Sequence, residues 1–112
     1  MSKRTSNFND FLVEQLRDPK FAAAYLNEHY GYRGPNRKEH LLEAIKKVVE
    51  AQGFSKLSRE SGISRRTLYK AFSKEGNPTV GTLFSLFDTI GVGIRFDSDT
   101  SRKKGVRSKR AA

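Results

Sequence analysis

The stretch from Phe54 to Ser73, FSKLSRESGISRRTLYKAFS, decides the fold of this 112-residue chain. It contains two short segments with helical spacing of apolar residues, and Gly62 lies between them. Glycine reaches positive φ at little cost, which a sharp turn between two helices requires. Ser64 follows this corner and can accept a hydrogen bond from a free amide of the next turn, as an N-cap does. The sequence therefore predicts two helices joined by a tight corner, with the second helix beginning near Arg65.

The second of these helices has an apolar face and a basic face. Leu68 and Phe72 are four residues apart, so both point to the expected core, together with Leu57 and Ile63 from the preceding segment. Two outward rows repeat at the same spacing. They are formed by Arg65 with Tyr69 and by Arg66 with Lys70.

This pattern is typical of a helix-turn-helix, whose second helix lies in the DNA major groove with its first residues at the base edges. An arginine at that place can donate two hydrogen bonds to guanine O6 and N7. We therefore expect Arg65 and Arg66 to read bases, and Lys70 and Lys74 to neutralise phosphates. The alternative is an ordinary helical hairpin with a solvated charged face. The corner glycine, the capping serine and the clustered arginines together favour DNA binding.

The positive charge of the chain is concentrated in two places. The net charge is +10, and residues 54–74 contain six basic residues and one acidic residue. Residues 101–112, SRKKGVRSKRAA, contain six basic residues and no acidic one. Phosphate binding requires such concentration. The final stretch has no periodicity and is predicted to be a disordered tail, which either adds phosphate contacts or only increases solubility.

Several classes of protein are disfavoured by the composition. There is no cysteine, so disulfides and thiolate metal sites are not available, and a reducing cytoplasm is the expected location. No apolar run approaches the roughly 20 residues of a membrane helix, and no secretory signal is present. The chain has two histidines, His29 and His40, and we expect His40 at the surface, so no metal or other cofactor is expected. No nucleophile with a base, carboxylate pair or phosphate-cradling loop indicates an enzyme.

Four further helical segments and one strand are predicted outside the central stretch. The helices cover Asn7 to Leu16 with Asn7 as a cap, Phe21 to Tyr30 after a start at Asp18-Pro19, Asn36 or Arg37 to Gln52, and Val80 to Ile90 after Thr79. Alternation at Val92, Ile94 and Phe96 predicts the short strand, which needs a partner in a second copy or in another protein. Phe84 is an extra aromatic residue on its helix, suited either to the core or to an oligomer contact.

The chain is expected to have three parts. Residues 1–34 form amphipathic helices, residues 35–96 form a helix-turn-helix DNA-binding domain, and residues 97–112 form the disordered basic tail. Two interpretations of the first part remain open. The helices either pack on the core as a hairpin or form an arm that docks in a groove of a partner protein.

The stretches DPKFAAAYLNEHY and AQGFSKLSRESGISRRTLYKAFSKEGNPTVGTLFSLFDTIGVGIRF resemble the addiction-module antidote family, the HigA-like antitoxins of the lambda-repressor or XRE helix-turn-helix class. The resemblance runs from about Asp18 to Phe96. It implies an all-α bundle of about five helices, a homodimer, a RelE-like toxin that cleaves messenger RNA as a partner, and an operator in double-stranded DNA. By position it implies DNA contacts from Ser64, Arg65, Arg66, Thr67, Tyr69 and Lys70, with Thr67 at a phosphate.

The function expected from these observations is that of an antitoxin in a type II toxin-antitoxin module, which binds its toxin and represses its own operon. A stand-alone bacterial or phage regulator of the same fold is the alternative. A toxin reading frame beside the gene would separate the two. A third class, a general nucleic-acid-binding protein acting through its basic tail, predicts affinity that hardly depends on sequence.

Overall fold

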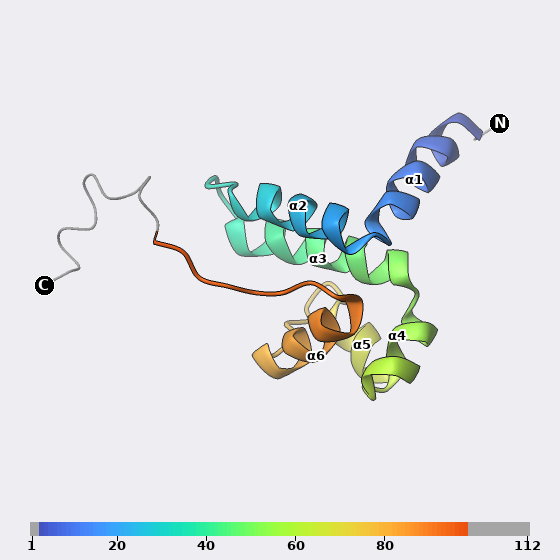
Figure 1. Ribbon diagram of the computed structural model, residues 1–112, viewed down its shortest axis with the longest axis vertical. Coiled ribbons are helices and arrows are strands. Elements are labelled where there is room, and N and C mark those ends of the chain that lie inside the picture. Colours follow the sequence, from blue (N-terminus) through green and yellow to red (C-terminus); the bar gives the residue numbers. More distant parts are fainter. Residues whose placement is uncertain (1–2, 99–112) are drawn as a thin grey trace, which may run out of the picture.

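The computed structural model describes residues 3–98, with side chains from Phe8 onward (Figure 1). This part of the chain consists of helices and connecting segments and contains no strand. The helices are α1 (Lys3–Leu16), α2 (Pro19–Tyr30), α3 (Arg37–Gln52), α4 (Phe54–Ser61), α5 (Arg65–Ala71) and α6 (Val80–Ile90). The all-helical class is confirmed, with six helices in place of about five. Of the predicted basic tail, residues 97–112, all but residues 97 and 98 lie outside the described residues.

Three helices begin where the sequence predicted, because a side chain caps each of them. Asp18 Oδ1 accepts a hydrogen bond from the Lys20 amide at 3.3 Å, and Pro19 is the first residue of α2. Ser64 Oγ accepts from the Thr67 amide at 3.1 Å at the start of α5. Thr79 Oγ1 accepts from the Thr82 amide at 3.0 Å at the start of α6. Each cap satisfies an amide that has no partner within its helix.

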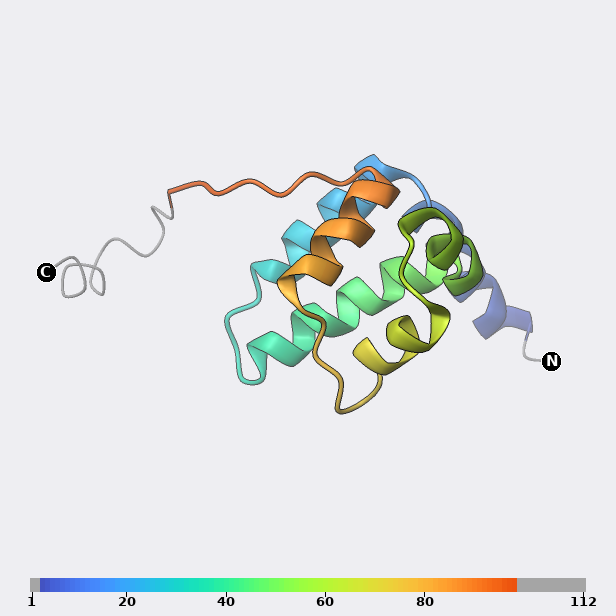
Figure 2. The same ribbon diagram turned by 90° about the horizontal axis from the view of Figure 1, so that it is seen from below.

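The longest helix, α3, lies in the middle of the molecule (Figures 1 and 2). It packs against α1 and α2 on one side and against α4 on the other, while α4 also packs against α5 and α6. Its buried residues are Ala44, Ile45, Val48, Val49 and Ala51. Removal of such side chains from water drives folding, at about 1.5–3 kcal/mol for a fully buried valine or leucine.

A single apolar cluster connects the N-terminal helices to the rest of the molecule. Leu16 at the end of α1 and Leu26 on α2 belong to the same cluster as Leu57 on α4 and Leu86 on α6. Leu16, Leu57 and Leu86 are almost completely buried. The end of α1 and the inner face of α2 are therefore part of the core.

One local prediction is wrong, and a second is not confirmed. Asn7 does not cap α1, because the helix already begins at Lys3. Residues 92–98 follow α6 without forming the predicted strand. The backbone groups of a strand must pair with those of a neighbour, and the described part of the chain places no segment beside these residues to do so.

Candidate nucleic-acid interface

The corner between α4 and α5 fixes the position of α5, the predicted DNA-recognition helix. Gly62 closes α4 at φ +83°, a left-handed conformation that most residues avoid. Leu57 on α4 and Leu68 on α5 are 1% and 0% exposed, so the two helices are joined through their apolar faces. Ile63 and Phe72 pack against the same cluster. The first turn of α5 is thus fixed by its cap on one side and by the core on the other.

The predicted DNA-contacting residues of α5 lie together on its outer surface. Ser64, Arg65, Arg66, Thr67, Tyr69 and Lys70 are all exposed. Within the described residues, the side chains of Arg65, Arg66 and Lys70 make no hydrogen bond and no ion pair. These cations need not break an ion pair within the protein when they bind a phosphate or a base, so this surface is suited to an anionic partner.

Two hydroxyl groups at the start of α5 have different roles. Ser64 Oγ accepts from the Thr67 amide and donates to Thr67 Oγ1 at 2.9 Å, so the proton of the serine hydroxyl is used within the cap. The proton of the Thr67 hydroxyl remains available for an external acceptor. A hydroxyl donor at the start of a helix is suited to a phosphate oxygen.

Tyr69 belongs both to the surface and to the packing of the corner. Its ring meets the ring of Phe54 at a centroid distance of 4.4 Å, and the side chain remains 55% exposed. The contact with Phe54 restricts the orientation of Tyr69. The tyrosine can therefore present a fixed edge beside Arg65 and Arg66.

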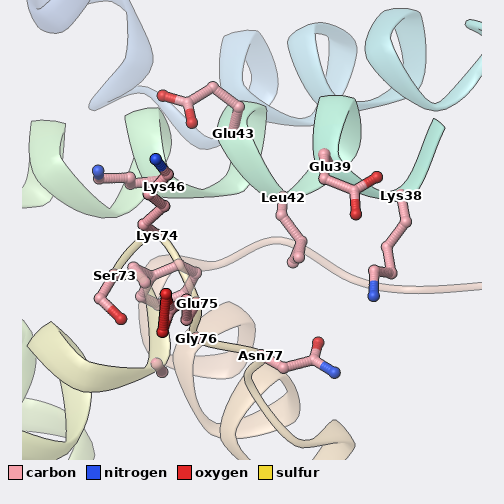
Figure 3. Close-up of a pocket in the computed structure, with 12 residues that line it drawn as sticks. Lys38, Glu39, Leu42, Glu43, Lys46, Ser73, Lys74, Glu75, Gly76 and Asn77 are labelled. Atoms are coloured by element: carbon pink, nitrogen blue, oxygen red, sulfur yellow. The ribbon is translucent and has the colours of Figure 1, made fainter. Parts of the chain in front are cut away.

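Lys74 lies apart from the other predicted residues. It comes from the turn after α5, whereas Arg65 is the first residue of this helix, whose seven residues span about 10 Å. Lys74 lines an open hollow of about 520 Å³ between this turn and α3, and Figure 3 shows the residues that line it. Three lysines and three glutamates line this hollow: Lys38, Lys46, Lys74, Glu39, Glu43 and Glu75. Its mixed charge does not favour an anion in the hollow itself, so the phosphate contact of Lys74 remains a prediction from the sequence.

An aromatic cluster at the turn between α2 and α3 was missed at the sequence level. His29 Nδ1 and His40 Nε2 are 2.9 Å apart, and the His40 ring stacks on Tyr32 at a centroid distance of 4.0 Å. His40 was expected at the surface, and its ring is only partly exposed because it packs between these partners. Among the described residues, no group of three potential metal ligands includes the pair.

Arg37 fixes the same turn from its other side. Its guanidinium lies 4.4 Å from the centroid of the Tyr30 ring and donates to the carbonyl oxygens of Tyr30 and Tyr32, each at 2.9 Å. The antiparallel course of α2 and α3 brings together residues that are 11 apart in sequence. Neither charge nor local periodicity marks such a cluster, and only the predicted helical hairpin could have indicated it.

A second exposed surface lies on α1, which projects from the body of the molecule (Figure 1). Phe8 and Phe11 are 72% and 61% exposed, although both lie on the helix whose end is anchored by the buried Leu16. None of the helices described between residues 3 and 98 is long and apolar enough to cross a membrane. Exposed aromatic rings on a projecting helix are suited to contact with another protein.

Comparison with known proteins gave two matches. The model of a family described as probable addiction module antidote protein matches residues 4–98. A protein of Haemophilus influenzae (strain KW20 Rd), described as uncharacterized, is 32% identical over 99 residues, which are 88% of this chain and 97% of that protein. No solved structure matches the chain.

Proposed function

We propose that this chain, which belongs to the family of probable addiction module antidote proteins, is the antitoxin of a type II module that binds a RelE-like toxin and represses its own operon. The antidote role of the family implies a toxin as partner and is not enzymatic. The operator, the RelE-like class of the toxin and the HigA-like or XRE assignment are parts of the proposal. The observation that carries DNA binding is the set of unpaired, exposed cations at the start of α5.

In the proposed complex, two copies of the chain form a dimer on a near-palindromic operator. Each copy places its α5 helix in a major groove, with the two helices about 34–36 Å apart, or one turn of DNA. Arg65 and Arg66 then face base edges, because the first residues of a recognition helix lie deepest in the groove. Thr67, Lys70 and Lys74 contact phosphates, with Ser64 holding the first turn and Tyr69 beside it.

The DNA assignment is tested by Arg66→Ala, with Lys20→Ala on α2 as a control that removes the same charge from another exposed position. Binding to the promoter duplex of the operon and to a scrambled duplex is measured by fluorescence anisotropy at one fixed salt concentration. We expect Arg66→Ala to lower the ratio of the two affinities by about 5- to 150-fold for each copy in the dimer, as the loss of a bidentate contact to guanine does. The Lys20 variant should keep the ratio. An unchanged ratio in both variants would contradict base reading by α5.

We further propose that the toxin docks on the free half of α1. An amphipathic helix that lays its apolar face in a groove is a recurrent mode of protein recognition, and Phe8 and Phe11 supply such a face. Burial of Leu16 fixes the end of α1 on the core, so the exposed half is presented at a defined angle. The expected occupant is the toxin, because the family assigns the chain a toxin partner.

The toxin assignment is tested by co-expression of the chain with the neighbouring reading frame. Phe8→Ser with Phe11→Ser should abolish capture of the neighbour and its neutralisation in a growth assay. The control is Asn9→Ala with Asp10→Ala, which changes two exposed polar positions of the same helix. Since all four side chains are exposed, neither pair should lower the melting temperature by more than a few degrees. Capture that survives the aromatic double variant would place the toxin elsewhere.

The runner-up function, a stand-alone regulator, shares the α5 surface but has no use for a toxin. A neighbour that neither inhibits growth nor binds this chain, together with intact operator recognition, would favour it.

A further inference from the structure

The residues after α6 form an arm that leaves the helical body. Val92 anchors its start, since this side chain is 7% exposed and its amide donates to the Phe87 carbonyl at 2.9 Å. Residues 93–98 are all exposed, and Figures 1 and 2 both show this segment running away from the helices. Phe96 is 94% exposed, more than any other large hydrophobic residue in the described part of the chain. A phenylalanine so exposed, on a segment that leaves the helices, is typical of a contact site for another chain.

The arm has the side-chain pattern and the free backbone of an unpaired strand. Ile94 and Phe96 alternate with Arg95 and Asp97, so an extended arm has an apolar and a charged face. Within the described residues, the backbone of positions 93–98 makes no hydrogen bond. β-branched and aromatic residues favour strands, and unpaired amides and carbonyls favour the addition of another strand.

We propose that this arm pairs with the same arm of a second copy, as an antiparallel two-stranded ribbon with its two-fold axis at Phe96. In this register Phe96 lies opposite Phe96 of the second copy on the apolar face. On the other face, Arg95 lies opposite Asp97 of the second copy, and Asp97 lies opposite its Arg95. Both oppositely charged pairs form at once, because a position one residue before Phe96 in one copy lies opposite the position one residue after Phe96 in the other.

Charge selects this register over its neighbours. An axis at Arg95 places two arginines opposite each other, and an axis at Asp97 places two aspartates opposite each other, both of which are unfavourable. An axis at Ile94 requires Val92 to pair with Phe96 of the second copy, but Val92 is already buried against its own chain. The arm is therefore complementary to itself in one register, which favours a second copy of this chain over an unrelated sheet edge.

Within one chain, the same two charges gain little from each other. Arg95 Nη2 and Asp97 Oδ1 are 3.5 Å apart, and the side chains are 80% and 75% exposed. An ion pair so exposed contributes little to stability. In the ribbon the two charges would bind across the dimer and set the register.

The charges can be tested by mixing two variants that should each be monomeric. Arg95→Asp places aspartates opposite each other in a dimer of that variant, and Asp97→Arg places arginines opposite each other. Each should raise the dimer dissociation constant by on the order of tenfold or more, since two attractive pairs become repulsive. An equimolar mixture should restore dimers, because each arm of the first variant then faces only arginines of the second. Sedimentation velocity without DNA or toxin measures this, so the result is independent of both proposed activities.

Cysteine cross-linking tests the register, and the chain contains no cysteine of its own to interfere. Phe96→Cys should give a disulfide-linked dimer on mild oxidation, because the two positions lie opposite each other. Ile94→Cys should not, since its equivalent in the second copy lies four residues along the strand, about 13 Å away, and disulfides require Cα atoms within about 7 Å.

Four results would overturn the proposal. The wild-type chain could be a monomer at 100 µM or above, or its dimer could be unaffected by both charge reversals. Cross-linking through position 94 in place of 96 would refute the register. Finally, the dimer could be lost in Phe84→Glu and retained in the arm variants, which would place the interface on α6, where Phe84 is 53% exposed. Rescue in the mixture together with cross-linking at position 96 would establish the ribbon.

Discussion

The geometry at the start of α5 depends on the hydroxyl of Ser64. It bonds both the amide and the hydroxyl of Thr67. We expect Ser64→Ala to lower the free energy of unfolding by about 1 kcal/mol, the usual cost of losing such a cap. Urea denaturation followed by circular dichroism measures this.

The control for Ser64→Ala is Ser55→Ala, an exposed serine of α4 that caps nothing. It should change the free energy of unfolding by less than about 0.5 kcal/mol. If the two variants have the same urea midpoint, the bond from Ser64 to the Thr67 amide does not stabilise α5 in solution.

Tyr25 should make the stability of the chain depend on alkaline pH. Partial burial raises the pKa of its hydroxyl above the ordinary 10.0, and the negative charge of Glu43 raises it further. The folded state therefore holds this proton more tightly than the unfolded state, so stability is lost as pH rises above 10. We expect Tyr25→Phe to lose less of its stability than the wild-type chain between pH 8 and 10.5, as measured by urea midpoints. Tyr30→Phe, which removes an exposed tyrosine hydroxyl, should follow the wild-type chain.

At the scale of elements, helix ends were predictable wherever a local chemical signal marks them. Asp18, Ser64 and Thr79 were recognised as caps from their place before an apolar pattern, and all three are caps in the structure. The start of α1 was not predictable, since residues 3–7 are polar and add nothing to the apolar periodicity that begins at Phe8. The missing strand has a different cause. An alternating pattern indicates that a segment favours pairing as a strand, but the strand forms only when a partner strand is present, and the described part of a single chain does not supply one.

The candidate interface was predictable because its residues are close in sequence, whereas the residues of the aromatic cluster are not. Arg65, Arg66 and Lys70 are close in sequence and lie on one helix, so helical periodicity alone brings them together. His29 and His40 meet only because α2 and α3 run antiparallel, which is a property of the packing. Whether the grouped residues of α5 contact DNA remains a prediction that the proposed experiments test.

The corner of the helix pair should tolerate alanine poorly at Gly62. Its φ of +83° costs an L-residue about 1–2 kcal/mol, although no atom lies within 4 Å of the position a Cβ would take. Gly62→Ala should therefore lower the free energy of unfolding by about 1 kcal/mol. Gly81→Ala is the matched variant, because Gly81 lies inside α6 and its Cβ would meet only Thr79 Oγ1 at 3.8 Å. It should raise stability by roughly 0.5–1 kcal/mol. Thermal unfolding of both variants measures the contrast, and equal shifts would contradict a strained corner.

At the scale of the whole molecule, the charge distribution separates affinity from specificity. The six basic residues of positions 101–112 equal in number those of residues 54–74, which include α4 and α5. Contacts to phosphates supply affinity without sequence information, whereas contacts to base edges supply specificity. The helix surface of α5 and the basic tail should therefore respond differently to removal.

Replacing all six Lys and Arg residues of positions 101–112 by Gln keeps the length of the chain and removes the charge of the tail. The affinity for the promoter duplex is then measured at several salt concentrations. The slope of log affinity against log salt is about −0.9 for each neutralised phosphate, so it should flatten by several units per dimer. The ratio of affinities for operator and scrambled duplex should stay unchanged, because phosphate contacts carry no base information. Arg66→Ala should instead lower the ratio of affinities. Its slope should flatten by only about one unit for each copy of the arginine, and only if that arginine also lies near a phosphate. A tail variant with the wild-type slope would show that these six charges do not contact DNA, leaving them the role of keeping a strongly basic chain in solution.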